Sequence, residues 1–315
     1  MGYTNETYGI YPASSENPVI IFDDFTTSFK WVNFPFKAKS SAMKMITPLE
    51  HAQIIFRYIY YAMKIINYKP GGHARQWIKN YSQIRIPVPP LEVQNAIVEI
   101  LDTFTALQQE LEAELEARKK QYEYYREEQL SFDDDEVEWK TLGEICEVKR
   151  GSRVTKRELD DNCSFPVYSG GVTPMGYLER SNQPANTVTV VKYGTAGFVN
   201  FVREEFWAND VCYCIKPLNQ GELDNKFLFY SLKNKQSTIK SLSTPAIPAH
   251  LPTEVLSNYK IPIPSLEKQK EIVATLDQFD ALVNDLSIGI PAEINARRLQ
   301  LEYYQNKLLT FKEKP

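Results

Sequence analysis

Five short segments between residues 149 and 250 combine basic, hydroxyl, amide and aromatic side chains with glycine. Lys and Arg can satisfy phosphates, Gly allows close backbone approach, and Asn, Ser, Thr, Arg and His can hydrogen-bond to base edges. The pattern favours contact with nucleic acid, although turns are polar in any protein. The candidate contacts are Lys149, Arg150, Ser152, Arg153, Tyr168, Ser169, Gly170, Lys192, Tyr193, Thr195, Asn209, Ser243, Thr244 and His250.

The N-terminal third of the chain offers a smaller set of the same residue types. They lie in the segments Lys37–Ser41 and Gly71–Trp77, each of which is short and polar. The same reasoning makes them possible DNA contacts. The candidates here are Lys39, Ser41, His73, Arg75 and Gln76.

Signatures of catalysis and metal binding are missing from the sequence. There is no Gly-rich phosphate loop, no Gly-x-Ser-x-Gly turn and no methylation motif of the Asn/Asp-Pro-Pro-aromatic type. The 3 histidines are far apart, and the 4 cysteines fit neither a disulfide framework nor a zinc site. Cys212 and Cys214 would face one side of a strand, as small core residues. We therefore expect a non-enzymatic protein without metal.

Length and charge limit the possible classes further. The chain has 315 residues, about twice a typical domain, and a net charge of −4, so overall charge does not indicate nucleic-acid binding. No stretch approaches the roughly 20 apolar residues of a membrane span, and the N-terminus has no signal pattern. The expected location is the cytoplasm.

An internal repeat dominates the sequence. Residues 86–107 reappear 175 positions later as residues 261–282, with 13 of 22 positions identical. Both copies read Ile-Pro-x-Pro-x-Leu-Glu-x-Gln at the start. The match resumes where Ala117-Arg118 corresponds to Ala296-Arg297, now 179 apart, so the second copy carries four extra residues near Leu286–Pro291. Since four residues are about one helical turn, we expect a longer second helix in the same phase.

The segments before the repeated helices also match, more weakly. Met1–Tyr3 corresponds to Met175–Tyr177, and Tyr61-x-x-Lys64 corresponds to Tyr230-x-x-Lys233. Because the second copy opens near Trp139, the first copy is expected to lack about 36 leading residues.

Each Pro-x-Pro precedes apolar residues at helical spacing. In the first copy a seam runs from Ile97 through Ile100, Phe104 and Leu107 to Tyr125; the second copy runs from Ile272 through Leu276, Phe279, Leu282 and Leu286 to Leu308. This spacing predicts two coiled-coil helices of about 40 residues, each about 60 Å long. Antiparallel pairing would relate the copies by a pseudo-twofold axis, whereas parallel pairing would bring both globular parts to one end.

Short strand signals fill the segment between the helices. Thr187–Val191, Gly197–Val202 and Val211–Ile215 are β-branched or aromatic runs, and one helix is expected at about Asn225–Lys240. The predicted domains are 1–85 and 136–260 for the globular parts, and 86–135 and 261–315 for the helices.

In combination, these motifs resemble the specificity (S) subunits of type I restriction-modification systems over nearly the whole chain. The segments that carry the resemblance are Leu142–Gly151, Tyr168–Gly171, Lys192–Gly197, Phe206–Val211 and the two Ile-Pro-x-Pro-x-Leu-Glu-x-Gln motifs. The implied fold class is α+β: two mixed α/β target-recognition domains separated by two long helices that pack as an antiparallel coiled coil.

The resemblance implies a function and partners. Each recognition domain would read one half of a bipartite site in double-stranded DNA, and the helices would fix the gap between the halves. The helices would also dock two modification (M) subunits, which use S-adenosylmethionine, and restriction (R) subunits would join the full complex. No cofactor is expected in this chain.

The short first copy departs from the family pattern. The residues that it lacks correspond to the Lys149–Arg153 and Tyr168–Gly171 segments, so its half-site would be read poorly or not at all. The alternative is an S-like scaffold that binds M subunits without full DNA specificity. The recognition part of a separate nuclease is disfavoured, because the sequence contains no catalytic segment.

Overall fold

The computed structural model describes residues 9–311, except 39, 41, 50–52, 73, 134–135 and 246. The repeat match at Met1–Tyr3 and the candidate contacts Lys39, Ser41 and His73 therefore lie outside the described residues. The chain divides into two compact units, one of Met1–Glu114 with Ala292–Pro315 and one of Leu115–Pro291. Helix α2 (Leu91–Gln129) begins in the first unit and ends in the second.

The first unit contains a small head that ends where α2 begins. Its main sheet has the order β3-β2-β5, with antiparallel neighbours, and β1 pairs with β4. Phe22 of β2 is buried in a cluster with Met63 of α1, whereas Tyr58 and Tyr61 of α1 are buried in a cluster with Leu101 of α2. The elements are β1 (Ile10–Tyr11), β2 (Val19–Asp23), β3 (Phe29–Val32), β4 (Phe36–Lys37), β5 (Met43–Ile46), α1 (Phe56–Lys64) and the 3-10 turn η1 (Tyr81–Gln83).

The second unit contains a larger head. A four-stranded antiparallel sheet has the order β11-β10-β13-β7, a three-stranded sheet has the order β12-β8-β9, and β14 pairs with β6. The elements are β6 (Glu138–Thr141), α3 (Leu142–Ile145), β7 (Cys146–Arg150), η2 (Lys156–Glu158), β8 (Phe165–Tyr168), β9 (Tyr177–Leu178), β10 (Thr187–Val191), β11 (Val199–Val202), β12 (Trp207–Ala208), β13 (Cys212–Pro217), α4 (Asn225–Asn234), α5 (Gln236–Ser241), α6 (Thr253–Ser257) and β14 (Lys260–Ile263).

The apolar strand runs of the sequence form the centre of this second sheet. Every residue of β10 is buried, as its unbroken β-branched composition predicts for a strand covered on both faces. The predicted strands at 187–191, 197–202 and 211–215 are confirmed as β10, β11 and β13. The helix expected at 225–240 is present but divides at Lys235 into α4 and α5.

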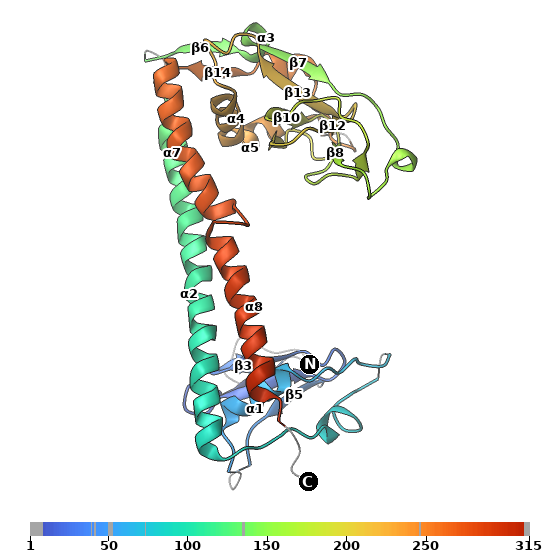
Figure 1. Cartoon of the computed structure of the whole chain (residues 1–315), viewed down its shortest axis with the longest axis vertical. Helices are drawn as coiled ribbons and strands as arrows, with labels where there is room; N and C mark the ends of the chain where they lie inside the picture. The colour runs from blue at the N-terminus through green and yellow to red at the C-terminus, as the bar shows by residue number, and fades with distance from the viewer. Residues whose placement is uncertain are drawn as a thin grey trace. The chain divides into compact units, whose positions relative to one another are not determined.

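The long helices pair antiparallel within each unit (Figure 1). In the first unit Phe104 of α2 stacks on Tyr304 of α8 (Ile290–Leu309), with ring centroids 5.2 Å apart. In the second unit Phe279 of α7 (Leu266–Asn284) stacks on Tyr125 of α2 at 5.3 Å. Phe279 and Tyr304 are the repeat counterparts of Phe104 and Tyr125, so one contact occurs in both units. The predicted antiparallel packing and the α+β class are confirmed.

The predicted seam was wrong at one position in each copy, and these two positions do not correspond in the repeat. Ile100 is 40% exposed and Leu282 is 38% exposed, whereas Leu101 is 0% and Val283 is 2% exposed. The reason is tertiary: each long helix also packs against the helix of the head that precedes it. Leu101 shares a cluster with Tyr58 and Tyr61 of α1, and this contact rotates the buried face away from a two-helix seam.

The four extra residues of the second copy do not lengthen its helix. Helix α7 has 19 residues and α8 has 20, against 39 in α2, and residues 285–289 form a turn between α7 and α8. Asp285 stabilises the turn by accepting hydrogen bonds from the backbone N–H and the hydroxyl of Ser287. A Cβ on Gly289 would lie 2.4 Å from the Ala281 carbonyl oxygen, so only glycine fits there. The expectation of a longer helix is therefore wrong.

Candidate nucleic-acid interface

Each head is fixed to its long helix by the glutamine of the repeated motif. Gln94 Oε1 accepts from the Ile55 backbone N–H at 2.8 Å, and its amide donates to the Pro89 carbonyl at 2.7 Å. Gln269 does the same with the Asp224 N–H and the Pro264 carbonyl, at 2.8 Å each. Both glutamines are fully buried. The motif therefore sets the angle between the head and the helix that follows it.

A carboxylate eight residues further on, about two helical turns, holds the head helix in the same way. In the first unit Asp102 accepts from the Tyr61 hydroxyl at 2.5 Å and from Arg57 Nε at 2.7 Å. In the second unit Asp277 accepts from the Tyr230 hydroxyl at 2.7 Å and pairs with Lys226. Burial and the carboxylate beside it raise the pKa of Tyr61 to about 12, so its hydroxyl stays a donor.

In the second head Asn209, which follows β12, ties three of the predicted contact loops together. Its side-chain oxygen accepts from the Val154 N–H at 3.2 Å, and its amide donates to the Val154 carbonyl and to the Ser169 hydroxyl. Its backbone N–H donates to the Tyr168 carbonyl at 2.9 Å. Since Asn209 is only 5% exposed, its side chain positions the loops rather than facing a ligand.

Two glycines join the loop after β8 to the loop after β10. A Cβ on Gly170 would lie 2.6 Å from the Tyr193 carbonyl oxygen, and Gly194 has φ +90° against Gly170. The Thr195 backbone N–H and hydroxyl both donate to the Gly170 carbonyl at 3.0 Å. The small side chains predicted to allow close backbone approach to DNA thus allow approach of one loop to another.

The loop that contains His250 joins the same group. The Tyr193 and His250 rings stack at 4.5 Å and 15°, and Thr244 donates its backbone N–H to the His250 carbonyl at 2.8 Å. Contacts therefore connect all five predicted segments into one surface, which we call the loop surface. It comprises residues 149–153, 166–171, 191–197, 206–210, 242–245 and 247–250.

A buried cation lies beneath this surface. Lys192 is 7% exposed, and its ammonium lies 5.4 Å from the ring centroid of Tyr193 and 5.5 Å from that of Tyr213. Burial, and then the positive charge of Arg150, lower the pKa of Lys192. The aromatic faces partly replace the water that the ammonium loses.

The other predicted residues divide by exposure. The side chain of Lys149 is 69% exposed and pairs with Glu147. Lys149 and Arg150 belong to the end of β7 rather than to the loop after it. The exposed members of the set are Lys149, Arg150, Ser152, Arg153 and Thr195; the partly exposed ones are Tyr168, Ser169, Gly170, Tyr193, Ser243, Thr244 and His250.

The first head is organised around a buried carboxylate instead. Asp24, directly after β2, is 0% exposed; it accepts from the Trp77 N–H at 2.7 Å and pairs with Lys44 at 3.4 Å. The predicted contact Gln76 is 1% exposed, and its amide donates to the Ala74 carbonyl at 2.7 Å. Gln76 therefore shapes its loop, whereas Arg75 beside it is exposed.

Two residues near the loop surface were missed by the sequence analysis. The guanidinium of Arg180 lies 4.8 Å from the ring centroid of Trp207 in β12. Ile247, at the tip of the last loop, is fully exposed. A guanidinium can bind phosphate, and an exposed apolar side chain can contact a thymine methyl group. Ile247 is apolar and carries no polar signal, whereas Arg180 lies in the polar run Glu179–Gln183, which was not among the selected segments.

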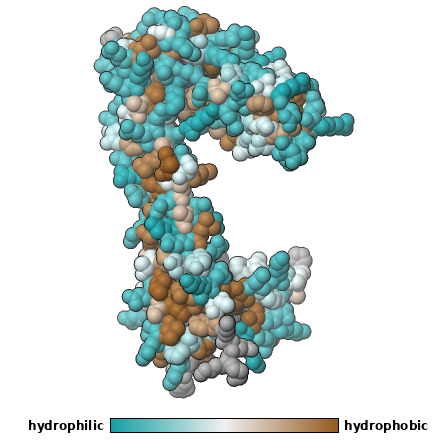
Figure 2. Space-filling model, viewed as in Figure 1, coloured by the Kyte–Doolittle hydropathy of each residue, from teal (hydrophilic) through white to brown (hydrophobic). Residues whose placement is uncertain are grey.

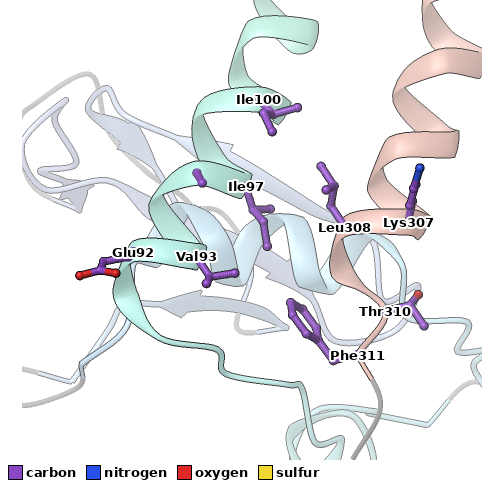
Figure 3. Close-up of a pocket in the computed structure, with 9 residues that line it drawn as sticks. Glu92, Val93, Ile97, Ile100, Lys307, Leu308, Thr310 and Phe311 are labelled. Carbon is purple, nitrogen blue, oxygen red and sulfur yellow. The ribbon is translucent and has the colours of Figure 1, made fainter.

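The first unit also has a pocket of about 460 Å³ between the start of α2 and the end of α8 (Figure 3). Val93, Ile97 and Ile100 line it from α2, and Leu308 and Phe311 line it from the other side. Figure 2 shows hydrophobic surface over this part of the paired helices. The counterparts of Val93 and Ile100 in α7 are Lys268 and Thr275, so the apolar lining belongs to the first copy alone.

Three of the four cysteines, Cys146, Cys212 and Cys214, are core residues, whereas Cys163 is partly exposed. Cys212 and Cys214 are buried and free, and burial raises the pKa of Cys214 to about 12, so its thiol stays protonated. Within the described part of the chain, no group of three or more His, Cys, Asp and Glu side chains is placed to hold a metal ion. Likewise, no described helix is long and apolar enough to cross a membrane.

Comparison with known proteins gives consistent matches. Residues 16–118 and 134–296 match the family "Type I restriction modification DNA specificity domain". The chain is 39% identical to the specificity subunit of the Escherichia coli type I restriction enzyme EcoR124I/EcoR124II, over 99% of this chain and 84% of that protein. It is 34% identical to a putative type I specificity subunit of Mycoplasma pneumoniae, over 74% of this chain and 98% of that protein.

A solved structure shares the fold. The type I restriction-modification S subunit from M. genitalium aligns with a TM-score of 0.65 and 18% identity, over 99% of this chain and 86% of that one. At this identity the likeness concerns the fold alone.

Proposed function

Because the chain belongs to the type I restriction-modification DNA specificity family, we propose that its loop surface reads one half of a bipartite DNA site. Specificity subunits are the non-catalytic, DNA-recognising components of type I systems, and the resemblance noted in the sequence is confirmed. The observation that supports the proposal for this surface is the joining of five loops through Asn209, Gly170 and the Tyr193–His250 stack.

Roles within the loop surface follow from exposure. The exposed cations Lys149, Arg150 and Arg153 are suited to phosphates, and the partly exposed Tyr193 and His250 are suited to base edges. Buried Lys192 adds positive potential beneath them. Asn209 and the paired glycines hold the loops in place, so that no ordering is required when DNA binds.

The proposal also includes the protein partners of this chain. Two M subunits would dock on the paired helices and carry S-adenosylmethionine, which this chain itself would not bind; R subunits would complete the complex. The expected location is the cytoplasm, where host DNA is. The first head, built around Asp24 and Lys44, would read a different half-site from the second, or read it weakly.

The test is DNA binding and methylation by the chain reconstituted with its M subunits. Arg150→Ala and Arg153→Ala should each weaken binding to the DNA site that the complex methylates. Each should also reduce the number of counterions released on binding, measured as the slope of log K against log salt concentration, by about one. Arg203→Ala is the matched control, because Arg203 is exposed, pairs with Asp280 on α7 and belongs to none of the five loops.

Two results would argue against the proposal. Equal effects of Arg150→Ala and Arg203→Ala would show that only general charge matters. Methylation without any defined sequence motif would favour the scaffold that binds M subunits without DNA specificity.

The role of the helices as a spacer has its own test. Four residues inserted after Leu107, about one helical turn, should change the gap of the methylated site and leave both half-sites unchanged. Sequencing of methylated positions in a host that expresses the variant measures both. Altered half-sites with an unchanged gap would falsify the spacer role.

A further inference from the structure

Three cations lie close together beside the loop surface of the second head. The ammonium groups of Lys233 in α4 and Lys240 in α5 lie 4.7 and 5.8 Å from the ring centroid of Phe198. Arg126, near the end of α2, lies close enough to act on Lys233. Burial is the largest cause that lowers the pKa of Lys233, and the positive charges of Arg126 and Lys240 lower it further. We call Arg126, Lys233 and Lys240 the cation cluster.

The cation cluster is not neutralised by the described carboxylates around it. Among the residues that the structure describes, none of its three members forms an ion pair. Asp280 also acts on Lys233, but its effect is smaller than that of either cation. The ion pair of Asp280 is with Arg203, at 2.8 Å. The cluster therefore keeps an excess of positive charge, which favours a bound anion.

The lysines of the cluster keep hydrogen-bond donors that the fold does not use. Lys233 donates to the Val199 carbonyl and to Gln236 Oε1, each at 3.3 Å, and an ammonium has three donors. Gln236 Oε1 also accepts from the Val199 N–H at 2.8 Å, which fixes the position of Lys233. Lys240 is exposed. The cluster can therefore donate to a ligand without breaking contacts of the fold.

The cation cluster is continuous with the loop surface. A Cβ on Gly197 would lie 2.8 Å from the backbone N and Cα of Lys240, so the loop 191–197 packs directly against α5. Phe198, whose ring lies beside both ammonium groups, is the next residue. Helix α5 ends at Ser241, and the last segment of the loop surface begins at the following residue. A ligand seated on the loop surface therefore reaches the cluster when it extends past α5.

We propose that the cation cluster binds backbone phosphates of the DNA beside the half-site that the loop surface reads. A duplex is continuous, so phosphates follow the bases that occupy the loop surface, and each phosphate carries one negative charge. The lysine ammonium is suited to such a contact as a compact point charge. The inference rests on the proposed function and adds to it a contact that carries no sequence information.

The first copy has only part of this cluster. By the repeat, Lys64 corresponds to Lys233, whereas Gln305 corresponds to Arg126. Gln305 is 8% exposed, so an uncharged amide fits the equivalent position on α8. Arg126→Gln therefore introduces the residue of the first copy and removes one charge of the cluster with little strain expected.

The experiment uses the chain reconstituted with its M subunits and two duplexes of equal length. One carries the DNA site that the complex methylates, and the other has a scrambled sequence. Lys240→Gln should reduce the slope of log K against log salt concentration by about one on both duplexes, and Arg126→Gln with Lys240→Gln by about two. The ratio of the two affinities should stay within about twofold of wild type, because phosphate contacts carry no sequence information.

Two controls separate this site from general charge. Lys235→Gln removes one exposed positive charge between α4 and α5, but Lys235 is not among the charges that act on Lys233. It should leave the slope unchanged. Lys240→Arg keeps the charge and should match the wild-type slope on both duplexes.

Hydrogen–deuterium exchange distinguishes the DNA backbone from free phosphate as the ligand. The scrambled duplex should slow exchange in α5 of the wild-type chain, and less so in Lys240→Gln. Inorganic phosphate at the same ionic strength should leave exchange in α5 unchanged.

Three outcomes would overturn the inference. Lys240→Gln could keep the wild-type slope on both duplexes, or Lys235→Gln could reduce the slope equally. Inorganic phosphate alone could slow exchange in α5 as much as DNA does, which would make the cluster a site for free phosphate. Failure of the proposed function gives a different result. Wild type would then bind both duplexes equally, while the slopes on the scrambled duplex would still test the cluster.

Discussion

The two heads share a framework but have opposite charges at one buried position. Lys192 follows β10 and donates its backbone N–H to the Val211 carbonyl; Asp24 follows β2 and donates to the Ala42 carbonyl. Val211 and Ala42 precede the equivalent strands β13 and β5, so Lys192 and Asp24 are structural counterparts. One is a buried cation and the other a buried carboxylate.

The residue beside each buried charge also differs between the two heads. Lys192 lies beside the ring of Tyr213, and the counterpart of Tyr213 in the first head is Lys44, which pairs with Asp24. Each buried charge therefore has a suitable partner. By contrast, Gln94 and Gln269, which lie in the first turns of the long helices, make the same hydrogen bonds to their heads. The attachment of the head to the helix is therefore the same in both copies, whereas the buried residues beneath the loops differ.

The strongest test of this comparison is Asn209, whose counterpart in the first head is Ser40. Asn209→Ala removes the hydrogen bonds that join three loops and should lower the free energy of unfolding by about 2–3 kcal/mol. Ser40→Ala removes one part-buried hydrogen bond, which Ser40 Oγ accepts from the Ala42 N–H, and should cost below about 1 kcal/mol. Urea unfolding of both variants measures this, and equal costs would contradict the special role of Asn209.

The turn at residues 285–289 distinguishes the two copies of the long helix. Gly289→Ala places a Cβ against the Ala281 carbonyl and should destabilise the protein by about 2 kcal/mol. Gly71→Ala is the control, because nothing lies within 4 Å of its Cβ position, and it should be neutral within about 0.5 kcal/mol. Thermal unfolding compares them; a neutral Gly289→Ala would show that the turn relaxes freely.

The carboxylates that hold the head helices should behave alike. Asp102→Asn and Asp277→Asn each weaken a tyrosine hydroxyl contact and remove an ion pair, and each should cost about 1–2 kcal/mol. Hydrogen exchange in α1 and α4 reports the two sites separately. A large effect in one head only would show that the heads are attached by different means.

The smallest effect concerns the pH dependence of Lys192. Because burial lowers its pKa in the folded state, the charged form costs the fold free energy below that pKa. The cost disappears as pH rises through the folded pKa toward the ordinary lysine value of 10.5. Wild type should therefore gain stability relative to Lys192→Met as pH rises, measured by urea unfolding. A difference that is constant with pH would place the ammonium in contact with water.

Local patterns in the sequence predicted the framework well. The β-branched runs of the sequence predicted β10, β11 and β13. The repeated motif marked its glutamine as a conserved feature of both copies. The buried face of the helices did not follow, because Leu101 and Val283 are buried by the head helices, which lie far away in sequence. The prediction assumed that the two long helices alone decide which face is buried, whereas in each unit a helix of the head packs against them as a third.

The sequence predicted which segments form the loop surface, but not the role of each residue in it. Polar residue types identified the five segments, yet Asn209, Gln76 and Lys192 are buried, while Arg180 and Ile247 were not selected. Which side of a loop faces solvent depends on the loops packed against it. Spacing along one chain does not contain that information.

The repeat, the strands, the two long helices and the family could be predicted from the sequence alone, because periodicity and repetition are properties of the chain. Only the tertiary structure decided whether the four extra residues became a turn, and which side chains are buried beneath the loops. It also decided that, among the described residues, β5 pairs with β2 alone. Each of these depends on which distant segments pack together, and packing is set by three-dimensional fit rather than by local pattern.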